Sequence, residues 1–511
     1  MEVLSKKMPM APNQTDWLAS TPVFYHARTG QSSTSINDLI DFDNFDFDPE
    51  GLKNYLDFGY SVFGLTPIKD IRFLEPCSRL VGSEAVRGED EVLRYLELPP
   101  VSESQIWEMF EARIQSWVSS QPASVIIPTS GGFDSRILNF FVKDRERIRS
   151  FTYGISRNQA RSYEAVYARE LSKILKTKWE LISLGHFHRY YDRWNTLFGP
   201  SVHAHGMYQM EFYDKIQERS SGSVLSGIVG DLWAGNHVVT TPIEHPKDLL
   251  ALGLSHQLKA DSQHLKLKAG TDARDQWWLD NQKILRNPQH HVVATVRMKL
   301  MLLRYLMLVP SAAGFSTWTP FLDIDLAMAM VNLPRERKQN RRWQREFFSK
   351  YGLELEKLHL KASFSNTLDL DALRLVPLQP LRADLLDEIV DERFKLRARQ
   401  LHVEVKRVSI RVHADERHGN VEFGARGQLF LRLLSDFLQA LQRELVLAEI
   451  DTVLLFELVG EVIEDADVEV FAAQEGVAVG GAHFEDAVAD LEDRDVEGAA
   501  AEVIDGDRLV G

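Results

Sequence analysis

Residues 124–136 read SVIIPTSGGFDSR, an apolar run that ends in a glycine-rich turn. The run Ser124–Pro128 predicts a buried strand, and we expect a helix to begin at Ser135. The adjacent glycines Gly131 and Gly132 let the backbone approach a ligand without a Cβ in the way. Unpaired N–H groups at the helix start, together with the helix dipole, favour an anion there. The stretch therefore predicts an anion-binding loop between a strand and a helix.

The polar side chains of this loop indicate a phosphate ligand and a metal ion. Ser130 and Ser135 add hydroxyl donors, whereas Asp134 adds a negative charge. A carboxylate beside a phosphate is unfavourable unless Mg²⁺ lies between them, so we expect Asp134 to bind Mg²⁺. The alternative is a glycine turn that joins a strand to a helix and binds no ligand.

The segment from about residue 100 to 380 alternates short β-branched runs with longer amphipathic stretches, which is typical of βαβ units around a parallel sheet. The predicted strands are Ser124–Pro128, Arg149–Gly154, Trp179–Leu184 and Ser223–Ile228. The predicted helices between them are Ser135–Val142, Arg161–Leu175 and Met207–Gln217, and residues 293–333 are expected to be mostly helical. We therefore expect an α/β fold with a parallel sheet flanked by helices.

A second acidic loop follows the last of these strands. Residues 224–235 read VLSGIVGDLWAG, again a strand that enters a glycine-containing turn, and they place Asp231 beyond the strand. Ligands of open α/β sheets gather at the carboxyl edge, so Asp134 and Asp231 are expected to share Mg²⁺. A third segment, Trp318–Asp323, reads WTPFLD; taken alone, Asp323 could simply cap a helix.

Composition sets the limits on function. The 511 residues include one cysteine, Cys77, which rules out an intramolecular disulfide and a CxxC metal or redox site. Residues 451–511 hold 18 acidic residues and two arginines, a net charge of −16, so the rest of the −15 chain sums to +1. Without a basic excess, a signal peptide or a membrane span, we expect a cytoplasmic protein that binds neither nucleic acid nor membrane.

The end of the chain differs in composition from the body. No proline occurs after Pro380 and no lysine after Lys406, while Val, Ala, Glu, Asp, Leu and Arg dominate. Two interpretations remain open: an acidic helical or disordered appendage, or translation from a shifted reading frame. We expect three regions: a small N-terminal domain at 1–97, the α/β domain at 98–385 and an anomalous C-terminal extension at 386–511.

The loop SGGFDS resembles the SGGxDS pyrophosphate loop of the N-type ATP pyrophosphatases, a HUP-like fold. With the acidic second loop and the PFLD segment, the chain is similar to the synthetase domain of asparagine synthetases and their relatives, the β-lactam synthetases and lasso-peptide cyclases. The resemblance runs from about Gly51 to Phe364. It implies that Asp134 and Asp231 bind Mg²⁺, with Asp231 also catalytic, and that ATP contacts Pro128, Ser130, Gly131, Gly132, Asp134, Ser135, Tyr153, Ser226 and Gly227.

The resemblance also implies a reaction. A substrate carboxylate attacks the α-phosphate of ATP to give an acyl-adenylate and pyrophosphate, and ammonia or an amine then displaces AMP. Residues 360–364, LKASF, lie where the family has K-x-G-F, so Lys361 is implied to be the catalytic lysine. Taken alone, Lys361 could be an exposed surface lysine.

The chain departs from the family at several positions. Glu2 stands where glutamine-dependent members have a nucleophilic cysteine, and the ATP loop comes about a hundred residues earlier than in those enzymes. We therefore expect a truncated glutaminase region and ammonia from solution or a partner, or an amine on the substrate. Val229, Leu232, Trp318 and Ser363 replace a glycine, an acid, an arginine and a glycine. These changes put aspartate as the substrate in doubt.

Three functions are weighed. The first is an amide synthetase of asparagine synthase type that acts on a small-molecule or peptide carboxylate. The second is a natural-product amide ligase or macrolactam cyclase, which the missing glutaminase nucleophile favours. The third is a degenerate ATP-binding module, which Leu232 and the anomalous C-terminus favour. A single cysteine and the absence of a basic excess disfavour a tRNA-modifying ATPase.

Overall fold

The computed structural model describes residues 13–121, 123–235, 242–253, 262, 265–366, 368 and 389–392. A five-stranded parallel sheet runs through it in the order β10-β9-β6-β7-β8. Its strands are β6 (Ser124–Pro128), β7 (Ile148–Thr152), β8 (Lys178–Leu181), β9 (Gly222–Leu225) and β10 (Ser316–Trp318). The predicted α/β fold with a parallel sheet flanked by helices is confirmed.

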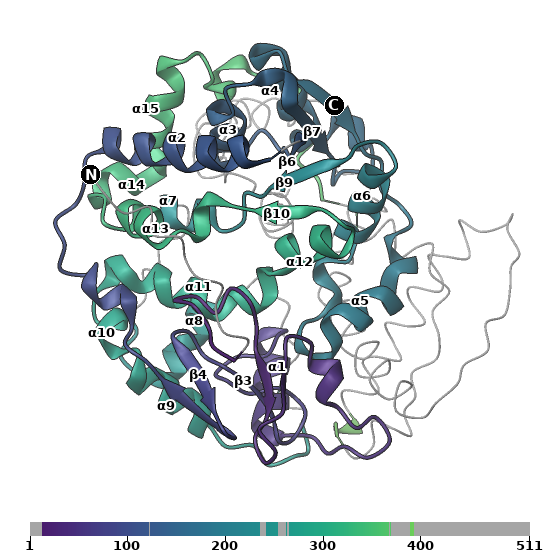
Figure 1. Ribbon diagram of the computed structural model, residues 1–511, viewed down its shortest axis with the longest axis vertical. Helices are drawn as coiled ribbons and strands as arrows, with labels where there is room; N and C mark the ends of the chain where they lie inside the picture. Colours follow the sequence, from purple (N-terminus) through teal and green to yellow (C-terminus); the bar gives the residue numbers. More distant parts are fainter. Residues whose placement is uncertain are drawn as a thin grey trace, which may run out of the picture.

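Helices lie on both sides of this sheet, with α2 (Glu103–Ser120), α3 (Phe133–Phe141) and α4 (Tyr163–Leu175) above it in Figure 1 and α11 (His291–Leu303) and α12 (Tyr305–Ala312) below it. The central strand β6 is apolar on both faces because both are covered, and Val125, Ile126 and Ile127 are fully buried. The other helices are α1 (Pro49–Phe58), α5 (Tyr191–Phe198), α6 (Tyr208–Gln217), α7 (Gly230–Ala234), α8 (Leu250–Gly253), α9 (Asp272–Asp280), α10 (Gln282–Leu285), α13 (Ile324–Val331), α14 (Arg335–Lys338) and α15 (Arg342–Lys350).

The strand order places a topological switch point beside β6. The chain builds β7 and β8 on one side of β6 and then crosses to build β9 and β10 on the other. At such a reversal the loops that follow the two strands diverge and leave a crevice at the carboxyl edge of the sheet. Here the two loops are residues 129–132 after β6 and residues 226–229 after β9. These are the two loops that the sequence singled out.

The N-terminal residues form two small antiparallel sheets below α11 (Figure 1). β1 (Phe24–His26) pairs with β2 (Ser32–Ser33) and β3 (Ile71–Phe73), and β4 (Ser78–Val81) pairs with β5 (Glu84–Arg87). The indole of Trp17 stacks on that of Trp233 with ring centroids 5.8 Å apart, so this part shares the core of the α/β domain. The division near residue 98 stays a prediction.

Details of the sequence prediction differ from the structure. All four predicted strands and the three helices between them exist, but β10 lies in the segment that was expected to be mostly helical. α3 begins at Phe133 rather than Ser135, because Gly132 adopts an extended conformation (φ −66°, ψ 167°) and caps it. Asp134 therefore lies in the first turn of a helix. The predicted C-terminal extension at 386–511 lies outside the described residues except for 389–392.

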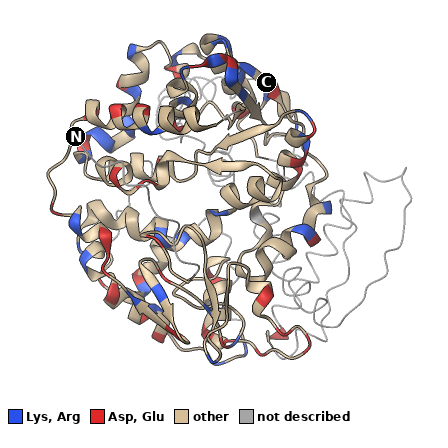
Figure 2. Cartoon of the chain, in the orientation of Figure 1, with Lys and Arg blue, Asp and Glu red and all other residues tan. Residues whose placement is uncertain are grey.

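The described surface mixes charges of both signs. In Figure 2, Lys and Arg residues interleave with Asp and Glu residues over most elements rather than gathering on one face. Within the described ranges, no helix is both long enough and apolar enough to cross a bilayer.

A buried ion pair ties the N-terminal region to α11. The Arg297 guanidinium donates two hydrogen bonds to Asp90, at 2.7 and 2.8 Å, and a third to the Trp17 carbonyl at 3.0 Å. Its side chain is 1% exposed. Asp90 also pairs with the partly exposed Arg87 at 3.7 Å, but its shorter contacts are those to Arg297, so the two desolvated charges chiefly compensate each other.

We therefore predict that Asp90→Asn or Arg297→Met alone lowers the free energy of unfolding by about 3–5 kcal/mol, because either leaves an uncompensated buried group. The double variant is expected to lose less than the sum of the two. Urea denaturation of the full chain measures this. Asp70→Asn is the control: its partner Arg28 is 74% exposed, so we expect a loss below about 1 kcal/mol. Additive losses in the double variant would contradict the prediction.

Candidate active site

The loop after β6 is fixed by a buried network of hydrogen bonds. The Thr129 amide donates to the Phe151 carbonyl at 2.9 Å, and the Asn139 amide group donates to the Thr129 hydroxyl at 3.0 Å. Within the turn, the Ser130 hydroxyl accepts from the Gly132 amide at 3.2 Å, and the Ser135 hydroxyl donates to the Gly132 carbonyl at 2.9 Å. The loop is therefore held in shape before any ligand arrives.

Gly131 is required by the geometry of this turn. Its φ of +79° lies in the left-handed region, which side chains with a Cβ rarely adopt. A Cβ at this position would also lie 2.5 Å from the Cβ of Tyr167 and 2.8 Å from its carbonyl carbon. The first glycine of the pair thus allows α4 to pack directly against the loop.

Asp134 carries a carboxylate that is buried in the core beside Asp231. The residue is fully buried, and among the described residues neither carboxylate oxygen has a well-aligned donor. Burial, followed by the negative charge of Asp231, raises the pKa of Asp134 well above its ordinary value of 3.8. The guanidinium of Arg341 and the backbone amide of Asp231 act in the opposite direction. An acid held in this way is poised to bind a cation.

The three sequence segments meet at Gly230. A Cβ added there would lie 2.6 Å from Oδ2 of Asp134 and 2.7 Å from Cε1 of Phe321. The first carboxylate, the β9 loop and the Pro-Phe-Leu-Asp segment are therefore in contact at one glycine. Asp231 follows directly, 7% exposed, in the first turn of α7. The predicted proximity of the two acidic loops is present in the structure.

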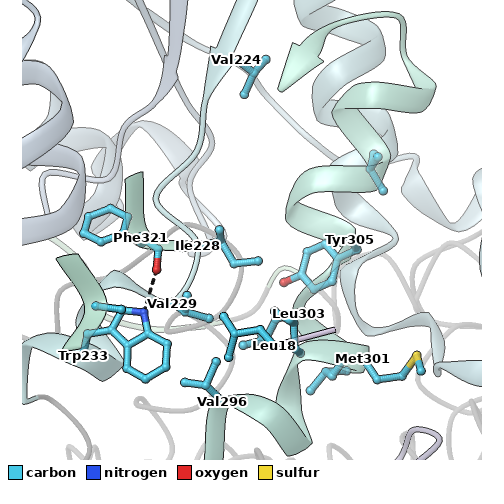
Figure 3. Close-up of a cluster of buried hydrophobic side chains, with 14 of the residues drawn as sticks. Leu18, Val224, Ile228, Val229, Trp233, Val296, Met301, Leu303, Tyr305 and Phe321 are labelled. Carbon is cyan, nitrogen blue, oxygen red and sulfur yellow. Dashed lines mark hydrogen bonds between the residues drawn. The ribbon is translucent and has the colours of Figure 1, made fainter. Parts of the chain in front are cut away.

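The β9 loop contains a strained residue. Val229 has φ 55° and ψ 7°, a left-handed conformation that is unfavourable for a β-branched residue. The glycine that the family has at this position would avoid the strain. Val229 is buried with its side chain beside Leu18 (Figure 3), so its packing offsets part of the cost. Leu232, where the family has an acid, is partly buried against the core.

Arg341 is a site residue that the sequence did not reveal. It is 1% exposed, it interacts electrostatically with both Asp134 and Asp231, and its guanidinium lies 4.7 Å from the ring centroid of Phe133. Burial lowers its pKa, and the two aspartates oppose that change. Nothing in the basic run RERKQNRR (335–342) distinguishes Arg341 from its neighbours. Only the fold selects it.

A second buried arginine, Arg136, supports the loop after β6 through a hydrogen bond to its backbone. Arg136 donates to the Gly131 carbonyl at 2.6 Å and forms a two-point ion pair with Glu356, at 2.9 and 2.5 Å. Neither residue was predicted from the sequence to belong to the site. Their separation of 220 positions leaves no local pattern.

The other predicted ATP contacts lie around the same edge of the sheet. Pro128 ends β6, and the Ser226 amide donates to the Trp318 carbonyl at 2.8 Å beside the partly exposed Gly227. The Tyr153 side chain is buried, and its hydroxyl accepts from Gln209 at 3.2 Å. A nucleotide contact at Tyr153 would therefore involve its main chain.

Asp323 acts as a helix cap, the simpler of the two interpretations. Its carboxylate accepts from the Leu326 amide at 3.1 Å at the start of α13 and pairs with Arg113 at 3.1 Å. The Phe321 side chain before it is fully buried, and its carbonyl accepts from Trp233 at 2.9 Å. The segment thus supports α7, which carries Asp231.

Lys361 lies on an exposed segment that docks onto the start of α4. Two residues later, the Ser363 amide donates to the Arg161 carbonyl at 2.7 Å and the Ser363 carbonyl accepts from the Tyr163 amide at 2.8 Å. The side chain of Lys361 is exposed, and within the described chain it forms no hydrogen bond or ion pair. The catalytic role of Lys361 stays a prediction.

The site has a donor set that suits Mg²⁺ with phosphate. No cluster of three or more His, Cys, Asp or Glu residues suited to a metal occurs among the described residues, but two carboxylates come together here. Mg²⁺ is commonly held by one or two carboxylates, with phosphates and water completing its shell. The orphaned oxygens of Asp134 fit that role, and Asp231 could share the ion.

Comparisons with known proteins find two family models that match parts of the chain. Residues 115–374, just over half of the chain, match the family model described as asparagine synthase. Residues 362–511 match a model described as NAD-specific glutamate dehydrogenase. A search of curated proteins finds no match.

We predict that Asp134→Asn stabilises the metal-free protein at pH 8 by on the order of 1 kcal/mol, because it removes a desolvated charge that repels Asp231. The folded-state pKa of Asp134 lies above its ordinary value, so the wild type loses stability as the pH rises from about 4. The gap between variant and wild type is thus expected to close toward pH 4. Urea denaturation in EDTA measures it. Asp323→Asn, which weakens an ion pair, is the control and is not expected to stabilise the protein; a less stable Asp134→Asn variant at pH 8 would refute the strain at this site.

Proposed function

Because the chain belongs to the asparagine synthase family, we propose that it is an ATP-dependent amide synthetase that releases AMP and pyrophosphate. The carboxylate is activated as an acyl-adenylate, and ammonia or an amine completes the amide. The observation that carries this proposal is the contact of Asp134, Gly230 and Phe321, which brings the three segments together around a buried carboxylate whose oxygens have no well-aligned donor among the described residues.

The phosphate-binding part of the site is the loop after β6. The triphosphate would lie against the turn Ser130–Gly132 at the start of α3, where backbone amides and the helix dipole favour an anion. Asp134 and Asp231 would hold Mg²⁺, which supplies charge neutralisation for the departing pyrophosphate. Arg341, buried beside both carboxylates, would add a fixed positive charge.

The first step is a displacement at phosphorus. An oxygen of the substrate carboxylate forms a bond to the α-phosphorus, the bond to the bridging oxygen breaks, and pyrophosphate takes the electron pair. Such a reaction depends mainly on positioning and on charge stabilisation. In the second step, the amine nitrogen attacks the acyl carbon, AMP leaves with the carboxyl oxygen, and the nitrogen loses a proton. Lys361, if it turns toward the α-phosphate, would stabilise negative charge in both steps.

We propose that this chain does not itself generate the ammonia or amine that completes the amide. Burial raises the pKa of its single cysteine, Cys77, which therefore stays a thiol and is a poor nucleophile. Free ammonia, an ammonia-supplying partner or an amine on the substrate would then serve.

A natural-product amide ligase or macrolactam cyclase is the second candidate. It is favoured by three departures from the family pattern that put aspartate as the substrate in doubt: Leu232 replaces an acid, Trp318 replaces an arginine and stacks on Trp117 with ring centroids 5.3 Å apart, and Ser363 replaces a glycine.

We propose no nicotinamide chemistry for residues 362–511, although they match the glutamate dehydrogenase model. The segment contains no G-x-G-x-x-G string, which is the usual phosphate-binding turn for a dinucleotide. The change of family model at 362 and the change of composition after Pro380 fall close together, which fits either interpretation of the tail.

The test is the exchange of labelled pyrophosphate into ATP that depends on an added carboxylate. We predict that Asp134→Asn and Asp231→Asn each lower exchange by at least about 100-fold, because the pyrophosphate loses its metal-mediated stabilisation. Asp325→Asn is the matched control, since that aspartate is 51% exposed and pairs with Arg113; its exchange should equal that of the wild type. Normal exchange in the Asp134 variant would contradict the proposal that Asp134 holds the Mg²⁺ ion.

The same assay separates the candidate functions. Exchange with aspartate supports an asparagine-forming enzyme, and exchange only with other acids or peptide pools supports the natural-product ligase. No exchange with any acid would leave an ATP-binding module and would overturn the proposal.

For Lys361, we predict that Lys361→Met lowers turnover by about 100- to 1,000-fold while the Kd for ATP stays within about two-fold, because the charge acts on the transition state. Lys357→Met is the control: that lysine is 70% exposed and pairs with Glu354. Single-turnover kinetics with nucleotide-binding calorimetry gives both quantities. Equal turnover in the two variants would make Lys361 a surface residue.

A further inference from the structure

Residues 353–364 (the lysine segment) follow α15 and carry Lys361. They contact the part of the fold around the turn Ser130–Gly132 (the phosphate turn) at two points, one before the lysine and one after it. Between the two points the chain turns at His359, whose left-handed conformation (φ 45°, ψ 48°) is unfavourable for a residue with a Cβ. Such a conformation persists only where the surrounding contacts hold the chain in place.

The first contact is the ion pair of Arg136 with Glu356. The Arg136 side chain is 0% exposed and that of Glu356 is 21% exposed. Nε of the guanidinium donates to the Gly131 carbonyl, both terminal nitrogens donate to the Glu356 carboxylate, and Nη1 also donates to the Leu353 carbonyl at 3.2 Å. One buried side chain therefore binds the phosphate turn and the lysine segment at the same time.

Aromatic rings and charge keep this ion pair in place. The guanidinium carbon of Arg136 lies 4.6 Å from the ring centroid of Phe133 in α3 and 6.0 Å from that of Phe348 in α15. Burial acts to raise the pKa of Glu356, but the charge and the hydrogen bonds of Arg136 hold that pKa below its ordinary value of 4.5. Glu356 is therefore ionised at neutral pH, and the pair is formed under the conditions of an enzyme assay.

The second contact is made by Ser363, which forms an isolated parallel bridge with Ser162 just before α4. α4 packs directly against the phosphate turn, because a Cβ on Gly131 would lie 2.5 Å from the Cβ of Tyr167. Both contacts of the lysine segment therefore lead back to Gly131, one through Arg136 and the other through α4. The candidate catalytic lysine lies in the chain between them.

We propose that Arg136 and Glu356 are positioning residues, which hold the lysine segment in one place relative to the phosphate turn. This inference rests on the proposed function, in which the turn binds the triphosphate and Lys361 acts at the α-phosphate. Charge stabilisation of this kind depends on position, and a misplacement of about 1 Å can lower a rate on the order of 100-fold. A buried ion pair adds little stability after desolvation, so a role in placing the chain accounts for it better.

Trypsin digestion of the full, folded chain tests whether the pair holds the segment. Lys361 is exposed and is a trypsin site, so the rate of cleavage after it, followed by mass spectrometry, measures local opening. We expect Glu356→Gln to raise this rate at least about ten-fold. Glu354→Gln is the matched control, because Glu354 lies on the same segment but pairs locally with Lys357; its rate should equal that of the wild type. Equal rates in Glu356→Gln and the wild type would overturn the proposal.

Kinetics test whether the pair acts through the lysine. With the carboxylate that supports pyrophosphate exchange, Glu356→Gln should lower turnover at saturating ATP about ten- to 100-fold. The Kd for ATP should stay within about two-fold, because Arg136 still binds the Gly131 carbonyl. In a Lys361→Met background the same substitution should change turnover less than about two-fold, since the group that it places is gone. Losses that multiply in the double variant would contradict a positioning role.

A double variant separates position from stability. Arg136→Met with Glu356→Leu removes both buried charges, so its Tm should exceed that of Glu356→Gln, which leaves Arg136 uncompensated. Its turnover and its cleavage after Lys361 should nevertheless resemble those of Glu356→Gln. Wild-type turnover and cleavage in the double variant would show that the pair only stabilises the fold. Absence of exchange in the wild type would overturn the proposed function, whereas the trypsin result decides separately whether the pair holds the segment.

Discussion

Two buried carboxylates held close together are the constraint on which the rest of this structure depends. Asp134 lies in the first turn of α3 and Asp231 in the first turn of α7, and the negative charge of Asp231 raises the pKa of Asp134. The fold tolerates the two acids because the positive charge of Arg341 acts on both of them. The large hydrophobic core around the site supplies the rest of the stability. The two acids lower the stability of the unliganded protein, and a bound cation would restore that stability. The arrangement therefore favours ligand binding at the expense of the stability of the unliganded state.

The parallel sheet explains why these loops meet. The switch point beside β6 leaves a crevice at the carboxyl edge of the sheet. Gly131 allows α4 to pack against the loop after β6, and Gly230 allows Asp134 and Phe321 to contact the loop after β9. Trp17 and Arg297 then join the N-terminal region to the same core.

Local features could be predicted from the sequence, and long-range ones could not. The strand Ser124–Pro128 and the site acids Asp134 and Asp231 could be predicted because each lies in a short stretch of sequence where an apolar run is followed by a glycine-containing turn. β10 was not predicted because a strand of three residues within a helical stretch is too short to show an alternating hydrophobic pattern. The positions of Arg341 and of the Arg136–Glu356 pair depend on contacts between distant segments, and nothing in the sequence around these residues distinguishes them.

The most direct test of the central claim is the proton balance of nucleotide binding. Because the pKa of Asp134 is raised in the unliganded protein, Mg²⁺ that binds with ATP should displace a proton from it. Titrating a non-hydrolysable ATP analogue with Mg²⁺ in buffers of different ionisation enthalpy measures this release. We predict a release that Asp134→Asn abolishes together with most of the Mg²⁺ dependence. An identical proton balance and Mg²⁺ dependence in wild type and variant would contradict a metal shared by the two acids.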